Sequence, residues 1–61
     1  MHGKQIIAKL QAAGWTLARI NGSHHVMMNG SIAVPVPVHG TKDIGVGLVA
    51  KIARQTGVKL K

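Results

Sequence analysis

Two copies of the tripeptide Asn-Gly-Ser, at residues 21–23 and 29–31, restrict the fold more than any other feature of this sequence. Asn-Gly is a strong signal for a two-residue hairpin turn, because both central positions of such a turn need a positive φ. The segments around the two copies are rich in strand-forming residues, and they span Trp15 to Ile20, Ser23 to Met28 and Ser31 to Val38. The sequence therefore predicts three antiparallel strands joined as a meander.

Pro35 and Pro37 alternate within the third of these segments. Proline has no amide hydrogen to donate to a neighbouring strand, so within sheets it is found on edge strands or at bulges. We therefore expect the third strand to lie at an edge of the sheet, with its later half extended and unpaired.

A helix is predicted on each side of the meander. Residues Gly3 to Ala13 carry apolar side chains at three- and four-residue spacing, and a glycine follows them. A second amphipathic helix is predicted to start near Gly45 to Gly47 and to run to Thr56, before another glycine. Residues 39–43 form a polar loop ahead of this helix, and residues 58–61 are expected to be a short basic tail.

The predicted order of helix, three strands and helix corresponds to an α+β fold in one domain that spans residues 1–61. Two amphipathic helices would pack on one face of a three-stranded antiparallel sheet and form a two-layer sandwich. Double-stranded-RNA-binding domains have this same α-β-β-β-α order, and they contact RNA through its shape, its phosphates and its 2′-hydroxyl groups.

The chain has eight Lys and Arg residues but a single acidic residue, Asp43, which gives a formal net charge of +7. A compact domain with this charge attracts phosphate backbones, so nucleic acid is the favoured partner. The absence of cysteine excludes disulfides and thiolate metal sites. The apolar runs are shorter than the roughly 20 residues of a membrane span, and residues 1–13 are amphipathic, unlike a secretory signal. We therefore expect a soluble, cytoplasmic protein without membrane contact.

His24 and His25, directly after the first Asn-Gly-Ser, are the candidate chemical groups. Histidine is the only side chain whose unperturbed pKa lies near neutrality, so it can accept and donate a proton there. Adjacent strand residues point to opposite faces, so these two imidazoles cannot easily bind one metal ion, and a single carboxylate cannot hold two cations. RNA supplies its own nucleophile, the 2′-hydroxyl group, and its cleavage needs no metal. The sequence favours metal-free chemistry on RNA, but it leaves open which histidine faces outward and whether both are merely polar surface residues.

Several other residues have two interpretations each. Trp15, the single aromatic residue, is interpreted as a core residue, although its ring could also stack on a base. His39 is either a second acid or phosphate contact, or an ordinary loop residue. The cations of the C-terminal half form either a phosphate-binding face or a solvated one, and we favour the former because so few acids offset them. These cations are Lys42, Lys51, Arg54, Lys59 and Lys61.

Four motifs together resemble those of HicA-type toxins, the small ribonuclease partners of HicB antitoxins. They are Gly-Trp-Thr-Leu at residues 14–17, Gly-Ser-His at 22–24, Val-Pro-Val-Pro-Val-His at 34–39, and the stretch from Lys42-Asp43-Ile44 through Gly47-Leu48 and Ile52 to Gly57. The resemblance rests on the order and spacing of the four motifs together, and it covers nearly the whole chain.

The resemblance implies a metal-independent, mRNA-cleaving toxin with a double-stranded-RNA-binding-domain-like fold. It implies that the histidine after Gly-Ser, His24, is catalytic, with His25 as the alternate, and that Gly22 allows the turn that presents His24. The expected partners are mRNA and a HicB-type antitoxin that covers the His24 face, and no small-molecule cofactor or metal is expected. The expected RNA-binding residues are Ser23, His39, Lys42, Lys51 and Arg54.

Two other functions remain open for this sequence. A non-catalytic RNA-binding module would use the same basic face, and its salt-dependent affinity for RNA would survive the loss of His24. A structural or adaptor domain, whose charge is incidental, would have no affinity for RNA.

Overall fold

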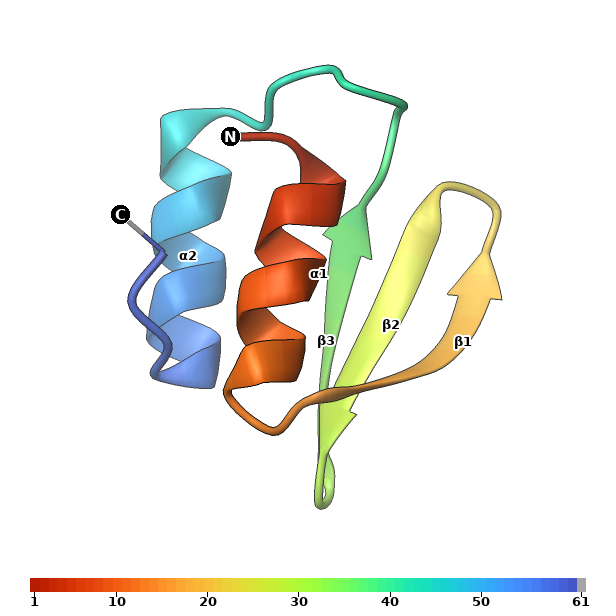
Figure 1. Ribbon diagram of the computed structural model, residues 1–61, viewed down its shortest axis with the longest axis vertical. Coiled ribbons are helices and arrows are strands. Elements are labelled where there is room, and N and C mark those ends of the chain that lie inside the picture. The colour runs from red at the N-terminus through yellow and green to blue at the C-terminus, as the bar shows by residue number, and fades with distance from the viewer. Residues whose placement is uncertain (61) are drawn as a thin grey trace.

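The computed structural model describes residues 1–60, which form a helix, three antiparallel strands and a second helix (Figure 1). These elements are α1 (Gly3–Ala12), β1 (Thr16–Asn21), β2 (His24–Asn29), β3 (Ile32–Pro37) and α2 (Val46–Thr56). Strand β2 lies between β1 and β3 in the sheet, and each strand begins one residue later than predicted. The predicted α+β order is confirmed. Within residues 1–60, neither helix combines the length and the apolar character that crossing a membrane requires.

Both hairpin turns are built on a glycine followed by a serine. Gly22 and Ser23 connect β1 to β2, and residues 30–31 take the same places between β2 and β3. The two glycines have φ values of 58° and 60°, whereas no other residue type within residues 1–60 has a positive φ. This is the pattern of a type II′ turn, in which only the first central position needs a positive φ. The hairpins are therefore confirmed, but the expected turn centred on Asn-Gly is wrong, because Asn21 and Asn29 are the last residues of their strands.

Strand β3 lies at an edge of the sheet, as its prolines predict, but it pairs with β2 along its whole length. The Val38 amide donates to the Ser23 carbonyl at 2.7 Å. Because donors alternate in direction along a strand, the amides of residues 34 and 36 also face β2, and positions 35 and 37 face away. Pro35 and Pro37 therefore occupy positions where an amide hydrogen would point away from β2, and no hydrogen bond to β2 is lost. The prediction that the later half of the third strand is unpaired is wrong. The prolines also remove donors from the free edge, which hinders pairing with another chain.

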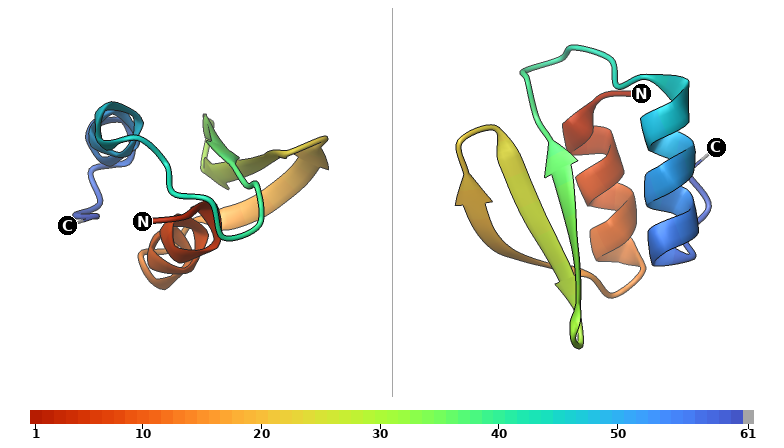
Figure 2. Two further views of the ribbon diagram at one scale, coloured as in Figure 1. Left: turned by 90° about the horizontal axis from the view of Figure 1, so that it is seen from above. Right: turned by 180° about the vertical axis from the view of Figure 1, so that it is seen from behind.

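Both helices pack on the same face of the sheet, the face that carries Met27, Val34 and Val36 (Figures 1 and 2). Trp15, which precedes β1, is 4% exposed and belongs to this core, so its interpretation as a core residue is confirmed. The β1–β2 hairpin extends beyond both helices (Figure 2). The remaining buried members of the core are Ile6, Leu10, Val49, Ile52 and Leu60.

The segment after α2 returns to the core. Leu60 is 3% exposed and packs with the core residues, and Val58 is half-buried against them. Residues 58–60 are therefore not the simple basic tail that the sequence suggests, because their apolar side chains are covered. Lys61, the last residue of the predicted tail, lies outside the described residues.

Helix α1 approaches the end of β3 closely at its first residue, Gly3. Gly3 is buried, and a Cβ atom added there would lie 2.8 Å from Val38 Cγ2 and closer still to the Pro37 carbonyl oxygen. Real Cβ atoms do not make contacts this short, so the first turn of α1 can reach the strand only because residue 3 has no side chain. This contact holds α1 against the end of β3.

Candidate active site

His24 is the first residue of β2 and directly follows the Gly22–Ser23 turn. Its cross-strand partners are Asn21 on β1 and Pro37 on β3. The imidazole is exposed to solvent. The type II′ turn therefore places this side chain at the end of the central strand, held by a neighbour on each side.

The two adjacent histidines lie on opposite faces of the sheet. His25 shares its face with the core residue Met27, whereas His24 shares the other face with Val26. We refer to the His24 face as the open face, because both helices pack on the other one. His25 is half-buried, and its Nδ1 atom is buried without a hydrogen-bond partner among residues 1–60. His24 is therefore the histidine that a large molecule can reach, which the sequence pattern alone left open.

Three of the predicted RNA-binding residues lie at the same end of the sheet as His24. The Ser23 carbonyl accepts a hydrogen bond from the Val38 amide at 2.7 Å, which places His39 beside the β1–β2 turn. The Lys42 amide donates to the His39 carbonyl at 3.0 Å, so Lys42 lies in the adjoining turn. Ser23 is half-buried, and the other two are exposed. We refer to these three residues together with His24 as the His24 end.

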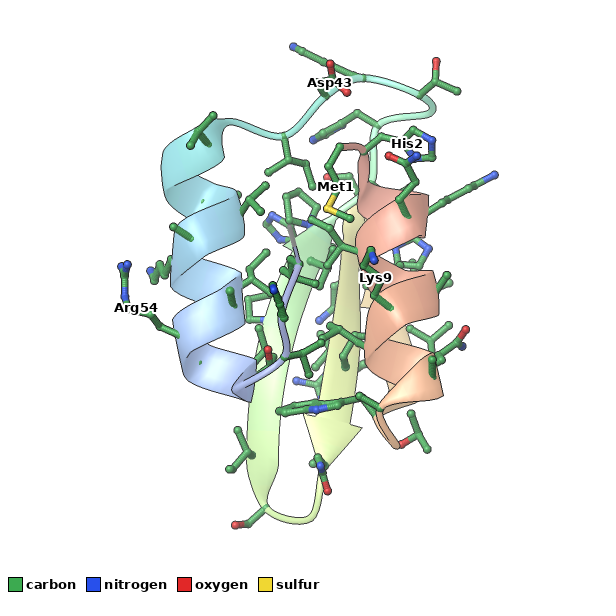
Figure 3. The ribbon with its side chains drawn as sticks, turned by 60° about the vertical axis from the view of Figure 1, so that its left-hand side comes forward. Met1, His2, Lys9, Asp43 and Arg54 are labelled. Atoms are coloured by element: carbon green, nitrogen blue, oxygen red, sulfur yellow. The ribbon has the colours of Figure 1, made fainter. Side chains whose placement is uncertain are left out.

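The loop that carries His39 and Lys42 is attached to the N-terminal residue. The Met1 amine pairs with the Asp43 carboxylate at 3.2 Å, and the Ile44 amide donates to the Met1 carbonyl at 2.8 Å (Figure 3). Asp43 is the only acidic residue of the chain. Among residues 1–60, His24 therefore has no acidic side chain as a hydrogen-bond partner.

The other two predicted RNA-binding residues, Lys51 and Arg54, lie on α2. Figures 1 and 2 show α2 on the far side of β3 from the β1–β2 turn, and Arg54 projects away from α1 (Figure 3). Both side chains are exposed. The structure therefore divides the predicted RNA-binding residues into two groups, one at the His24 end and one on α2.

Two surface hollows of about 310 and 230 Å³ lie beside α2. They share Val49 and Leu60, and the larger one is also lined by Arg54 and Lys59. Neither hollow is lined by His24, which lies on the exposed surface of the sheet. Small-molecule sites enclose most of their ligand, whereas an exposed side chain on an open sheet suits a large, extended substrate.

Proton transfer and charge neutralisation are what this arrangement offers chemically. Within residues 1–60, no three His, Asp or Glu side chains converge in a way that could hold a metal ion. An exposed imidazole can accept or donate a proton, and the cations around it can neutralise the charge of a phosphate group.

Sequence reasoning overlooked one cation on the open face, Arg19. Arg19 pairs with Val26, which shares the open face with His24. In a regular strand Arg19 would share a face with Leu17, but the register shifts between them, and Leu17 pairs with the core-facing Met27. Because side-chain alternation gives no sign of this shift, the sequence pattern could not place Arg19 beside the histidine.

Comparison with known protein families gives a match over nearly the whole chain. The family described as the HicA toxin of bacterial toxin–antitoxin systems matches residues 3–58 of the 61 residues. Comparisons with curated proteins and with solved structures give no significant match. The matched region includes both helices, the whole sheet and His24. The chain therefore belongs to the HicA toxin family and is a toxin of a bacterial toxin–antitoxin system.

Proposed function

We propose that this toxin is a metal-independent endoribonuclease that cleaves mRNA, with His24 as its general acid–base group and a HicB-type antitoxin as its inhibitor. The observation that carries the proposal is the exposure of His24 on the open face, at the start of the central strand. The family membership and the net charge of +7 support it, because a positively charged surface attracts a polyanion to this imidazole.

In the proposed reaction, the His24 imidazole accepts the proton of an RNA 2′-hydroxyl group. The 2′-oxygen attacks the adjacent phosphorus, so that a bond between these two atoms forms and the bond from phosphorus to the 5′-oxygen breaks. The leaving 5′-oxygen takes up one proton from water or from a cationic group at the His24 end, so no net proton is consumed. The products end in a 2′,3′-cyclic phosphate and a 5′-hydroxyl group. RNA supplies the nucleophile, and the protein supplies the base and the geometry.

The two groups of predicted RNA-binding residues suggest how the RNA strand lies on the toxin. Ser23, His39 and Lys42 are close to His24 and would contact the phosphates next to the cleaved bond. Lys51 and Arg54, on α2, would contact RNA that extends past the sheet, and these contacts would contribute to affinity and its salt dependence. On this proposal, the first group affects the cleavage rate and the second affects binding.

A toxin of a toxin–antitoxin system has an antitoxin partner, and the charge of this chain indicates the chemistry of that partner. The chain carries a single acidic residue and a net charge of +7, so an acidic surface on the antitoxin would complement the charge of the toxin. Such complementary charges would accelerate the association of the two proteins. We propose that a HicB-type antitoxin presents such a surface to the His24 end and thereby blocks the histidine from RNA. Binding would also stabilise this small domain by mass action.

Cleavage of a reporter transcript by the purified toxin, in the presence of EDTA, tests the proposed reaction. We expect full activity in EDTA, fragments that end in a 2′,3′-cyclic phosphate and a 5′-hydroxyl, and no cleavage of a DNA copy, which lacks the 2′-hydroxyl. Inhibition by EDTA, or fragments with a 5′-phosphate, would contradict the mechanism. Binding of the transcript without any cleavage would favour the non-catalytic RNA-binding module instead.

Gly22 and Gly30 provide a matched test of how the first turn positions His24. Their φ values are 58° and 60°, and nothing lies within 4 Å of a Cβ atom added at either one. Alanine at either position is expected to lower the free energy of unfolding by about 1 kcal/mol, because L residues rarely adopt this conformation. Only Gly22→Ala is expected to slow RNA cleavage, since Gly30 lies at the other end of β2 from His24. Urea unfolding and transcript cleavage measure the two effects, and equal cleavage by both variants would contradict this role of the first turn.

A further inference from the structure

An irregularity in β1 places Arg19 on the open face. The register between β1 and β2 shifts between Leu17 and Arg19, so these two residues pair with Met27 and Val26, which are consecutive on β2. Leu17 therefore remains on the core-facing side, and Arg19 lies on the side of His24. β-bulges are over-represented next to active sites, where they re-aim a side chain and bend the strand locally.

The register also fixes how Arg19 lies relative to His24. Arg19 is directly opposite Val26, and His24 is two residues before Val26 on the same face of β2. Such diagonal neighbours have Cα atoms about 7–8 Å apart, which long side chains span. The guanidinium group and the imidazole can therefore contact neighbouring atoms of one bound phosphodiester.

The burial of Val26 indicates where the stem of Arg19 lies. Val26 is 7% exposed although it is on the open face and lies outside the core cluster that the helices cover. Its cross-strand neighbours on this face are Arg19 and Pro35. Arginine stems commonly cover apolar side chains while the charged end remains in water. This packing would hold the Arg19 guanidinium group close to the surface of the sheet, while Arg19 as a whole stays exposed.

We propose that Arg19 binds the scissile phosphate and neutralises the negative charge that develops on its oxygens as the 2′-oxygen attacks. This inference rests on the proposed ribonuclease function. A planar guanidinium group donates two parallel hydrogen bonds to a phosphate, and a fixed donor aimed at developing charge lowers the barrier to reaction. Asp43, the only acidic residue, pairs with Met1, so Arg19 has no carboxylate side chain as a partner among residues 1–60 and its charge is available to RNA.

The test uses the purified toxin with three variants. Arg19→Met keeps an apolar stem over Val26 but removes the charge, and Arg19→Lys keeps the charge but loses the forked donors. Arg54→Met is the matched control for a loss of affinity alone, because Arg54 is an exposed arginine on α2 that is proposed to contact RNA away from the cleaved bond. Cleavage of a reporter transcript is measured at saturating toxin, and affinity is measured with a 2′-O-methyl copy of the same RNA, which has no free 2′-hydroxyl group.

Arg19→Met is expected to cleave about 100-fold more slowly than the wild type, the usual loss for one donor to a developing oxyanion. Its affinity for the 2′-O-methyl RNA should fall no more than that of Arg54→Met, and Arg19→Lys should recover part of the rate. If Arg19→Met cleaves the transcript at the wild-type rate, or if it loses only affinity for RNA, the proposed role of Arg19 is overturned. The ribonuclease proposal would remain intact in either case. A wild-type toxin that binds the transcript but does not cleave it would overturn both.

Discussion

Replacing His24 with alanine is expected to lower the rate of RNA cleavage by about 1,000-fold, within the range found when a general acid–base group is removed. The effect should be this large because the imidazole is the only group at the His24 end that the proposed mechanism uses as a base. The side chain is exposed and lies on the face of the sheet that the helices do not cover, so the fold should persist. Single-turnover cleavage of a reporter transcript measures the rate, and circular dichroism checks the fold.

His25→Ala is the matched control for His24→Ala. The two histidines are adjacent in sequence, but His25 faces the helices and His24 faces away from them. We expect His25→Ala to retain most of the cleavage activity, with any loss explained by lower stability. Equal losses of cleavage in the two variants, with both folded, would contradict the assignment of the base to His24. His24→Ala should still bind the transcript, because the cations that are proposed to attract RNA are unchanged.

Replacing Gly3 with alanine is expected to lower the free energy of unfolding by about 2 kcal/mol, which is the usual scale for overpacking a close contact. The added Cβ atom would meet the Pro37 carbonyl oxygen and would lie 2.8 Å from Val38 Cγ2. One of these neighbours is backbone, so α1 or the end of β3 must move. The cost exceeds the gain of about 1 kcal/mol that alanine normally provides over glycine in a helix. In a chain of 61 residues, such a loss is a large share of the total stability.

Gly47→Ala is the matched control for Gly3→Ala. Gly47 is also in the first turn of a helix, but nothing lies within 4 Å of a Cβ atom added there. Alanine at this position is expected to raise the free energy of unfolding by about 0.5–1 kcal/mol, because it restricts the unfolded chain without a clash. Urea unfolding of both variants measures the two changes. Stabilisation by Gly3→Ala would contradict the close contact between α1 and β3.

The order of the elements could be predicted because each one has a local signal. The spacing of Ile6 and Leu10 is helical, and Gly22 and Gly30 mark the two turns whichever turn type they form. The turn type itself could not be predicted, because Asn-Gly-Ser is compatible with Asn-Gly or with Gly-Ser at the centre. Trp15 could be assigned to the core because it is the only aromatic residue, and burying its large side chain removes more apolar area from water than burying any other side chain of the chain.

The position of the site depended on long-range pairing that the sequence does not encode locally. Strand β2 is apolar on both faces, so alternation could not tell which histidine faces outward until Met27 was found in the core. The same limit applies to Pro35 and Pro37, whose effect depends on which amides of β3 face β2. Arg19 was overlooked for a related reason, because its face is set by a register shift within β1.

Induced expression in a bacterium of the wild-type toxin beside His24→Ala, without an antitoxin, is the most direct test of a histidine-dependent ribonuclease toxin. Growth and the integrity of a reporter mRNA are scored, and immunoblotting confirms equal amounts of the two proteins. We expect growth arrest with loss of the mRNA for the wild type, and neither effect for His24→Ala. Arrest by both proteins with the mRNA intact would contradict the proposal, and it would direct attention to RNA binding without cleavage.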